Sequence, residues 1–464
     1  MPNGEVALSR IRLGPVRLHN ATVVLRPPRI DDYAEWRRIR LRDQRYIEPF
    51  WTTSPLDWAE RHTGKLWVRE VFDSRADARA SRRLGMVIEV NGRFAGQIEL
   101  GSIAVGNAPT PPPQRSDSSG GSSNSGGSSS SSGDGSSSGG SGELGIWVDA
   151  RLARHGIGGL AVAMMLDFGF RQAGLHRITA PISPANKGTA AGAAALGMRR
   201  EALMARYFDV GGERRDHDLW AVLASDLPAE GATENWIARH SGGEPIPEVQ
   251  ENEVAALSRT AVTLATARYY AGRTLHSADP LRKTSGMRLS DPAHPEVVVR
   301  NRRFSDWRRW RDSRVRARDR IAPGAATAEW GARHRYARWI REYLRARAGL
   351  HSSAGLVLAI EVDGVYTGEA RLFELDMFDR NARLFVWTEP PQDRVRETVM
   401  RLLISHGFDT LGLRRIATEI EPADTESIGI AERVGMIREG RMRQFVGPTG
   451  RRADYELWAV TSPA

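Results

Sequence analysis

The chain has 464 residues, of which 41% are hydrophobic and 26% charged, and it carries a formal net charge of +10. This length exceeds one ordinary hydrophobic core, and the composition is that of a soluble globular protein, so we expect two domains. The absence of cysteine excludes disulfides, cysteine-ligated zinc and thiol catalysis, and no apolar run approaches the roughly 20 residues that cross a bilayer.

The N-terminal residues lack the apolar core of a signal peptide, so we expect a cytoplasmic protein with no membrane partner. Almost all basic residues are arginines, because lysine occurs only at positions 65, 187 and 283. Such a surface attracts phosphate-bearing ligands and could bring the chain to RNA or a ribosome. No aromatic and basic recognition motif stands out, so nucleic-acid binding is not expected as the primary role.

From its start, the chain predicts alternating strands and helices. A strand at Val23–Arg26 precedes helical segments, rich in Arg and Trp, that reach about Phe72. The dipeptide Asn91-Gly92 is a strong hairpin signal. The elements expected after it are a strand at Leu144–Val148, a Gly-rich loop with a helix to about Ala173, a strand at His176–Ile182, a small-residue helix at Thr189–Leu196 and a hairpin that turns at Gly211-Gly212. This order predicts an α/β fold with a mixed, mostly antiparallel sheet flanked by helices.

Residues 106–142 form a low-complexity segment that is Pro-rich at first and then almost entirely Ser and Gly. The segment cannot bury apolar surface, so we expect a flexible loop. Its composition alone is typical of an interdomain linker, but the internal repeat of the chain indicates otherwise.

The chain repeats itself. Before the Ser/Gly segment, VVLRPPRIDDYAEW aligns with VVVRNRRFSDWRRW at an offset of 274 residues, and VIEVNGRFAGQIEL aligns with AIEVDGVYTGEARL at an offset of 272. After it, FGFRQAGLHRI aligns with HGFDTLGLRRI at an offset of 238. The fall from 272 to 238 makes the Ser/Gly segment an insertion of about 34 residues inside the first copy.

The repeat predicts two tandem domains. The first spans residues 1–226 and contains the insertion, and the second spans residues 295–464. Residues 227–294 form a linker, which includes an amphipathic helix within Asn252–Leu275 that we expect to pack on one or both domains.

A Gly-rich loop in the first copy can hold a phosphate. Gly156, Gly158 and Gly159 would let the backbone N–H groups at a helix start approach a pyrophosphate, with Arg154 and His155 adding positive charge. Close packing of the helix on a strand is the alternative reason for these glycines. The loop is no P-loop, because no Gly-Lys-Ser/Thr follows, and it lacks the third spaced glycine of a Rossmann fingerprint.

The first copy resembles the GNAT superfamily of N-acetyltransferases, and within it the RimJ/RimL branch that acetylates N-terminal amines of ribosomal proteins. The residues that carry the resemblance are the strand ELGIWV, the Gly-rich loop, FGF…GLHRI, Asn186 with Thr189, LGM and the terminal RRDHDLWAVL. The segment IEPFWTTSP looks like the one that follows the first helices in that branch.

The resemblance implies two GNAT-like domains and acetyl-CoA as cosubstrate, without a metal. The pantetheine would pair with the strand backbone, the pyrophosphate would lie on the loop amides, and Asn186 would hold the thioester end, with Thr189 in place of the usual Ser. The cofactor-binding residues expected on this basis are Ile146, Trp147, Val148, Arg154, His155, Gly156, Ile157, Gly158, Gly159, Asn186 and Thr189. Ala153 departs from the Arg or Gln usual in the family.

Catalysis in this family needs a deprotonated amine and a polarised thioester carbonyl. A backbone N–H near Ile146–Trp147 is the expected oxyanion donor. Glu143 and Glu99 are the candidate bases, with Glu48 behind them, although each is as readily a surface or substrate-orienting carboxylate. The position of the tyrosine that acts as an acid in some members is Ala193, so no acid is assigned.

The second copy has lost the features that bind acetyl-CoA. Arg394 and Arg396 replace Gly156 and Gly158, and Asp424 replaces Asn186. The helix start is preceded by Pro390-Pro391, and proline has no N–H to donate. We therefore expect the first copy to be catalytic and the second to be a degenerate partner, the two packing as a pseudo-dimer within one chain.

The predicted function is an acetyl-CoA-dependent N-acetyltransferase that acts on a primary amine, the N-terminal Ala or Ser of a protein such as a ribosomal protein. Two alternatives stay open. One is a small-molecule acetyltransferase for antibiotics or polyamines, and the other is a non-catalytic scaffold derived from the same fold. The sequence does not identify the acceptor.

Overall fold

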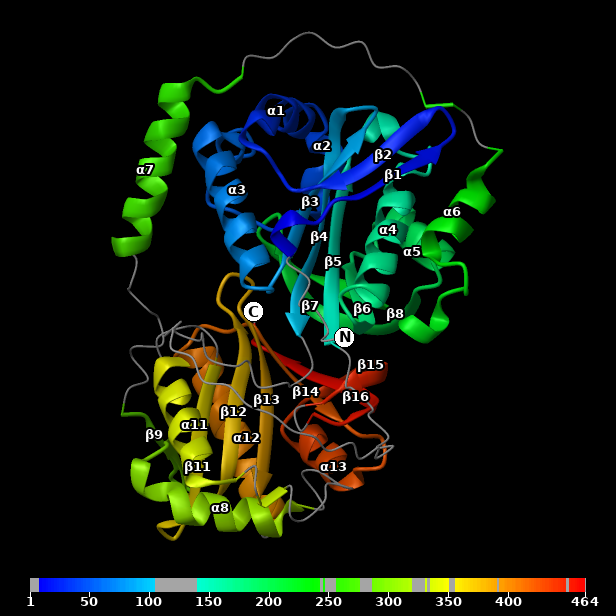
Figure 1. Ribbon diagram of the computed structural model, residues 1–464. Coiled ribbons are helices and arrows are strands. Elements are labelled where there is room, and N and C mark those ends of the chain that lie inside the picture. Colours follow the sequence, from blue (N-terminus) through cyan, green and yellow to red (C-terminus); the bar gives the residue numbers. More distant parts are fainter. Residues whose placement is uncertain are drawn as a thin grey trace, which may run out of the picture.

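The computed structural model describes residues 8–104, 140–242, 245–246, 256–275, 286–318, 330–331, 334–349, 355–389, 392–447 and 450–463. Within these ranges the strands form a single 16-stranded sheet with helices on its faces (Figure 1). Adjacent strands are antiparallel except β5 with β6 and β13 with β14, which are parallel. The predicted α/β fold with a mostly antiparallel sheet is confirmed.

The first half of the sheet contains eight strands. Its elements in chain order are β1 (Leu13–Leu18), β2 (Ala21–Arg26), α1 (Tyr33–Arg42), α2 (Gln44–Ile47), α3 (Gly64–Arg79), β3 (Leu84–Val90), β4 (Arg93–Ala104), β5 (Gly140–Val148), α4 (Ile157–Arg171), β6 (Leu175–Ile182), α5 (Lys187–Ala195), β7 (Arg199–Val210), β8 (Glu213–Leu223) and α6 (Ala232–His240). Strand β5 starts at Gly140, so the last three residues of the expected insertion belong to the sheet, and residues 105–139 lie outside the described part.

The second half repeats this order. Its elements are β9 (Arg288–Asp291), β10 (His294–Asn301), α8 (Trp307–Arg316), α11 (Tyr336–Gly349), β11 (Gly355–Val362), β12 (Val365–Asp376), β13 (Asn381–Thr388), α12 (Asp393–Asp409), β14 (Arg415–Ile420), α13 (Thr425–Arg433), β15 (Ile437–Val446) and β16 (Arg452–Thr461). The strand order runs β1-β2-β3-β4-β5-β6-β8-β7 and then, in mirrored sequence, β15-β16-β14-β13-β12-β11-β10-β9.

Each half has its own core and its own copy of a buried ion cluster. In the first half Arg26 contacts Asp32 at 2.7 Å and also binds Glu89. In the second half Arg300 contacts Asp306 at 2.8 Å and binds Glu361 at 2.6 Å. These pairs keep the spacing seen in the sequence repeat, so the clusters fix the turn into the first helix in both halves.

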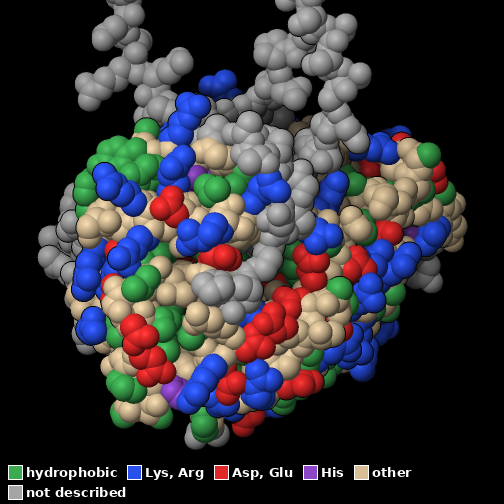
Figure 2. Space-filling model, turned by 90° about the horizontal axis from the view of Figure 1, so that it is seen from below, with side chains coloured by type: hydrophobic (Ala, Val, Ile, Leu, Met, Phe, Trp, Pro, Cys, Tyr) green, Lys and Arg blue, Asp and Glu red, His purple; other side chains and the backbone are tan. Residues whose placement is uncertain are grey.

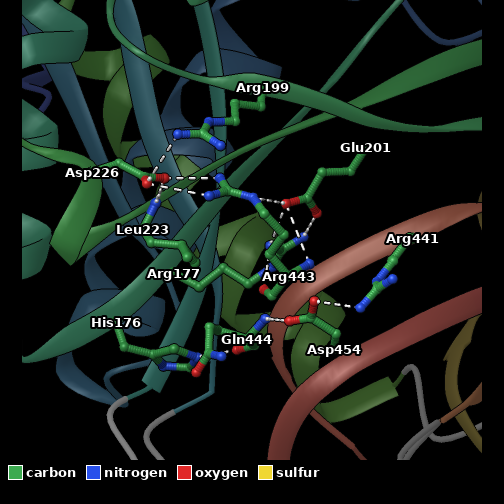
Figure 3. A network of polar contacts seen from close by, with 10 residues as sticks. All are labelled: His176, Arg177, Arg199, Glu201, Leu223, Asp226, Arg441, Arg443, Gln444 and Asp454. Carbon is green, nitrogen blue, oxygen red and sulfur yellow. Dashed lines mark hydrogen bonds and ion pairs between the residues drawn. The ribbon is translucent and has the colours of Figure 1, made fainter. Parts of the chain in front are cut away.

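The two halves join through β7 and β15, where Ala202 pairs with Gly440. An apolar cluster that includes Met204, Met442 and Tyr455 covers this junction. Polar contacts extend it, because Arg443 reaches Glu201 at 3.1 Å and Asp226 at 2.8 Å in the other half (Figure 3).

Two helices lie in the described part of the stretch between the halves. Helix α6 lies beside α4, and α7 (Arg259–Leu275) packs beside α3 (Figure 1). Tyr269 of α7 stacks on Phe72 with ring centroids 5.1 Å apart, and its hydroxyl donates to Asp73. The predicted amphipathic helix therefore packs on the first half. No described helix combines the length and apolar character needed to span a bilayer.

Candidate active site

The first element of the site is a strand edge that the sheet leaves open. Parallel pairing of β5 with β6 begins at Gly140 and ends where Glu143 faces Thr179. On its other side, β5 stays paired with β4 as far as Val148. Among the described residues, Leu144–Val148 thus have no strand partner on the β6 side, because the two parallel strands diverge. Their backbone N–H and C=O groups can pair with an extended ligand.

A helix start lies directly beyond this edge. Gly156 is the N-cap of α4 with φ +77°, a conformation that favours glycine. The N–H groups of Ile157, Gly158 and Gly159 have no backbone acceptor within the described chain. Val148 lies beside Gly158, since its Cγ2 is 3.4 Å from the place where a Cβ would stand. The open edge therefore leads to free amides that can hold an anion.

Gly159 has a packing role as well. A Cβ at this position would lie 2.0 Å from Cζ2 of Trp236 in α6. The Trp236 indole N–H donates to the carbonyl of Gly156 at 2.9 Å, and its ring stacks on His240. Gly159 is therefore needed for close packing, although against helix α6 and not against a strand as the alternative had it. Helix α6 was not predicted, because nothing in the repeat points to it.

Asn186 and Thr189 stand at the start of α5. The Asn186 side chain accepts a hydrogen bond from the Thr189 N–H at 3.2 Å and caps the helix. Asp424 caps α13 in the same way, with the Ser427 N–H at 3.0 Å. The exchange of Asn for Asp therefore preserves the cap, and toward a ligand it adds a negative charge and removes the amide N–H donors.

Glu99 and Glu143 lie on one face of the sheet, next to the diverging strands. Glu99 pairs with Gly145, and Gly101 pairs with Glu143, so the two carboxylates are diagonal neighbours. Oε1 of Glu99 is 3.6 Å from the place where a Cβ of Gly145 would stand. Burial, and then the Glu99 carboxylate, raise the pKa of Glu143 to about 7. A carboxylate with that pKa can accept a proton near neutral pH.

Glu48 lies in a different setting from these two. It belongs to the short 3₁₀ turn Glu48–Phe50, where it accepts a hydrogen bond from Gln44 at 2.6 Å. No described contact joins Glu48 to Glu99 or Glu143. The described residues also contain no group of three or more His, Cys, Asp or Glu side chains that could hold a metal ion.

The second half closes the equivalent space. Arg396 stands where the first half has Gly158, and it binds Asp393 at 2.8 Å, Glu426 at 2.7 Å and the Ser427 hydroxyl at 3.1 Å. One arginine side chain thus spans the starts of α12 and α13. Pro390, which the sequence analysis also singled out, lies outside the described residues together with Pro391.

The second half also inverts the charge of both candidate bases. The pairs Gly96–Val148 and Gly368–Thr388 are equivalent, which places Arg371 at the position of Glu99 and Arg383 at that of Glu143. Arg383 binds Glu419 at 2.8 Å. The repeat offset of 272 residues gives the exchange at Glu99, whereas the exchange at Glu143 needs an offset of 240, which the strand pairing shows and the sequence offset of 238 does not.

Comparisons with known proteins point to one family. Residues 22–199 match the family model described as acetyltransferase (GNAT) domain. The solved structure of Mycobacterium smegmatis RimJ in complex with CoA-disulfide is 34% identical, and the match covers 50% of this chain and 95% of that chain, with a TM-score of 0.41. The chain belongs to the GNAT acetyltransferase family.

Two further proteins are similar to this GNAT chain. The putative ribosomal N-acetyltransferase YdaF of Bacillus subtilis (strain 168) is 27% identical over 124 residues, which are 26% of this chain and 64% of the relative, so the match spans less than two thirds of that protein. The ribosomal-protein-S5-alanine acetyltransferase of Vibrio fischeri is 18% identical, with 46% of this chain and 97% of that chain covered and a TM-score of 0.35. The prediction of a GNAT acetyltransferase is confirmed.

Proposed function

We propose that the first half binds acetyl-CoA and transfers its acetyl group to a primary amine. The observation that carries this proposal is the contrast between the halves. The first half joins an open β5 edge to free amides at the start of α4, whereas Arg396 fills the same place in the second half. The second half then serves as a structural partner that replaces the second subunit of a dimer.

The residues fit such a ligand. The backbone of Ile146–Val148 would pair with the pantetheine, and the amides of Ile157–Gly159 would hold the pyrophosphate, with Arg154 and His155 nearby. Asn186 and Thr189 stand at the neighbouring helix start. Acetyl-CoA supplies the acetyl thioester.

We assign the proton transfer to Glu143, with Glu99 beside it. The acceptor nitrogen forms a bond to the acetyl carbon while the C–S bond breaks, its proton passes to the Glu143 carboxylate, and the released thiolate is protonated by solvent. The backbone N–H groups near Ile146–Trp147 would stabilise charge on the carbonyl oxygen. The oxyanion role depends on the diverging strands, because Glu143 still pairs with Thr179 whereas Leu144–Val148 have no strand partner on that side among the described residues.

We further propose that the acceptor is the N-terminal amine of a protein, in a cytoplasmic setting. The names of the relatives refer to ribosomal proteins, and this supports the proposal. Figure 2 shows acidic and basic side chains interspersed on the face that it draws, so this face offers no uniformly basic surface for ribosomal RNA. A screen of N-terminal peptides, spermidine and aminoglycosides against the acetyl-CoA-loaded protein separates these acceptor classes.

Calorimetry with acetyl-CoA tests the core of the proposal. Gly158→Arg is the sharpest variant, since a side chain at Gly158 meets only Val148 while an arginine there would reproduce the second half. The wild type should bind one acetyl-CoA per chain, and the variant should lose it. Arg396→Gly is the matched control and should leave that affinity unchanged. Failure of the wild type to bind acetyl-CoA would refute the proposal.

A further inference from the structure

A buried arginine without a carboxylate partner lies beside the candidate active site. Arg40 of α1 is 3% exposed, and its guanidinium lies between the rings of Trp51 and Trp147, at 4.0 and 4.1 Å from their centroids. Its Nε and Nη1 atoms have no hydrogen-bond partner in the described chain. Burial lowers the pKa of Arg40 to about 9. A buried guanidinium lowers the stability of the protein unless a polar group accepts its hydrogen bonds.

The neighbouring polar groups are occupied with one another. The Gln97 amide donates to Glu70 at 2.6 Å, and its oxygen accepts from the indoles of Trp147 at 3.0 Å and Trp36 at 3.2 Å. Glu70 lies close enough to favour the charge on Arg40, but its carboxylate is already hydrogen-bonded to the Gln97 amide. Among the described residues no carboxylate forms an ion pair with Arg40, and its Nε and Nη1 donors have no partner.

The second half supplies an internal comparison. Arg314 repeats Arg40 and also lies over a tryptophan of the fifth strand of its half, Trp387, with 5.9 Å between the guanidinium and the ring centroid. Glu369 takes the position of Gln97, is fully buried and binds Arg314 as an ion pair. Glu369 also contacts Arg302 and Arg371, whose equivalents in the first half are Pro28 and Glu99, so the first half has lost both the carboxylate and two of its arginines. The half with the open strand edge is the half that leaves its arginine unpaired.

The position of Arg40 relates it to the acceptor and not to the cofactor phosphates. Trp147 and Gly145 face the same side of β5, and Glu99 lies over Gly145. Two residues along a strand span about 7 Å, so an acceptor on this face can lie close to both Glu99 and Trp147. Trp51 is 36% exposed, and the segment from α2 to Leu56 carries other exposed apolar side chains, Tyr46, Phe50 and Leu56.

We propose that Arg40 binds an oxygen of the acceptor, a carbonyl or carboxylate close to the amine that is acetylated. This inference rests on the proposed function and specifies its substrate class. The acceptor ammonium would lie near Glu99 and Glu143, and its oxygen at Arg40. Peptide N-termini and free amino acids have this arrangement, and polyamines do not.

Calorimetry on the full chain tests the assignment with two variants. The probes are tripeptides that begin with Ala or Ser, free L-alanine and spermidine, each titrated into the protein with and without saturating CoA, which cannot acetylate them. Arg40→Gln removes the charge, and Gln97→Glu neutralises it as Glu369 does in the second half. Arg69→Gln is the control, because it makes the same charge change on an exposed side chain of α3. Melting temperatures check that each variant folds, which is needed for Gln97→Glu because Glu369 has three arginine neighbours and a glutamate at position 97 would have Arg40 alone.

We expect the wild type to bind a tripeptide or alanine. The probe that binds more tightly shows whether the oxygen at Arg40 comes from a peptide or from a free amino acid. Both site variants should weaken this binding at least tenfold, while CoA affinity stays unchanged and Arg69→Gln behaves as wild type. Equal affinity in wild type and both variants would overturn the inference, as would binding of spermidine alone. Failure of the wild type to bind CoA would refute the proposed function instead. The titrations of the acceptor probes without CoA would still decide the role of Arg40.

Discussion

Replacement of Gly159 by alanine tests whether α6 is seated on the cofactor loop. Helix propensity alone predicts that Gly→Ala stabilises a helix by up to about 1 kcal/mol. The structure predicts the opposite sign at Gly159, because the new Cβ would lie 2.0 Å from Cζ2 and 2.3 Å from Cη2 of Trp236. Carbon atoms pack at about 3.5–4.0 Å, so the indole must move by roughly 1.5 Å or more.

The cost follows from what the indole would lose. Trp236 is 5% exposed and donates a 2.9 Å hydrogen bond to Gly156. Overpacking costs about 1–3 kcal/mol, and a lost hydrogen bond about 1 kcal/mol. We therefore expect Gly159→Ala to lower the free energy of unfolding by about 2–4 kcal/mol. Gly158→Ala is the matched control, because the nearest atom, Cγ2 of Val148, is at an ordinary 3.4 Å, and it should be neutral or slightly stabilising.

Urea unfolding, followed by circular dichroism, measures these differences. In a Trp236→Ala background the clash is absent, so the same Gly159→Ala change should cost nothing further, and the double-mutant cycle should show a coupling of about 2 kcal/mol or more. Equal stability of the Gly158→Ala and Gly159→Ala proteins, or an additive cycle, would refute the packing of Trp236 on the loop.

Three further predictions concern charges. For Glu143→Gln, kcat/KM for acetyl transfer should fall by about 10²-fold or more. In the wild type kcat/KM should rise with pH up to about 7, because the pKa of Glu143 is raised to that value, and this rise should disappear in the variant. An unchanged pH profile would exclude Glu143 as the base. Arg443→Ala should lower the free energy of unfolding by about 2–4 kcal/mol, because it breaks contacts to Asp226 and Glu201 across the junction. Burial alone would raise the pKa of Asp226, but the hydrogen bond from Arg443 lowers it overall. The stability that this contact contributes is therefore present above the usual carboxyl pKa and is lost as the pH falls through the lowered pKa. A stability difference between wild type and Arg443→Ala that does not change with pH in acid would contradict this. Arg314→Met should cost about 3–5 kcal/mol, because it removes a partner of the fully buried Glu369. Among the described residues no carboxylate lies within ion-pair distance of Arg40, so Arg40→Met should cost less in the same urea titration; equal losses would show that Arg40 is structural.

The sequence by itself determined the repeat, the α/β fold with its Gly-rich loop, and the loss of that loop in the second copy. These follow from local patterns, since hairpin dipeptides, strand and helix periodicity and aligned segments are read along the chain. The tertiary structure decided the rest. The divergence of β5 from β6, the indole of α6 on Gly159 and the raised pKa of Glu143 depend on segments far apart in the sequence.

Arg40 shows the same division most clearly. Its alignment with Arg314, and that of Gln97 with Glu369, are visible in the sequence, but only the fold brings each pair together and buries it between aromatic rings. A charge acquires its meaning from the groups that replace water around it, and those groups are set by packing. The sequence therefore identifies the residues, and the tertiary structure determines which of them are left to bind a ligand.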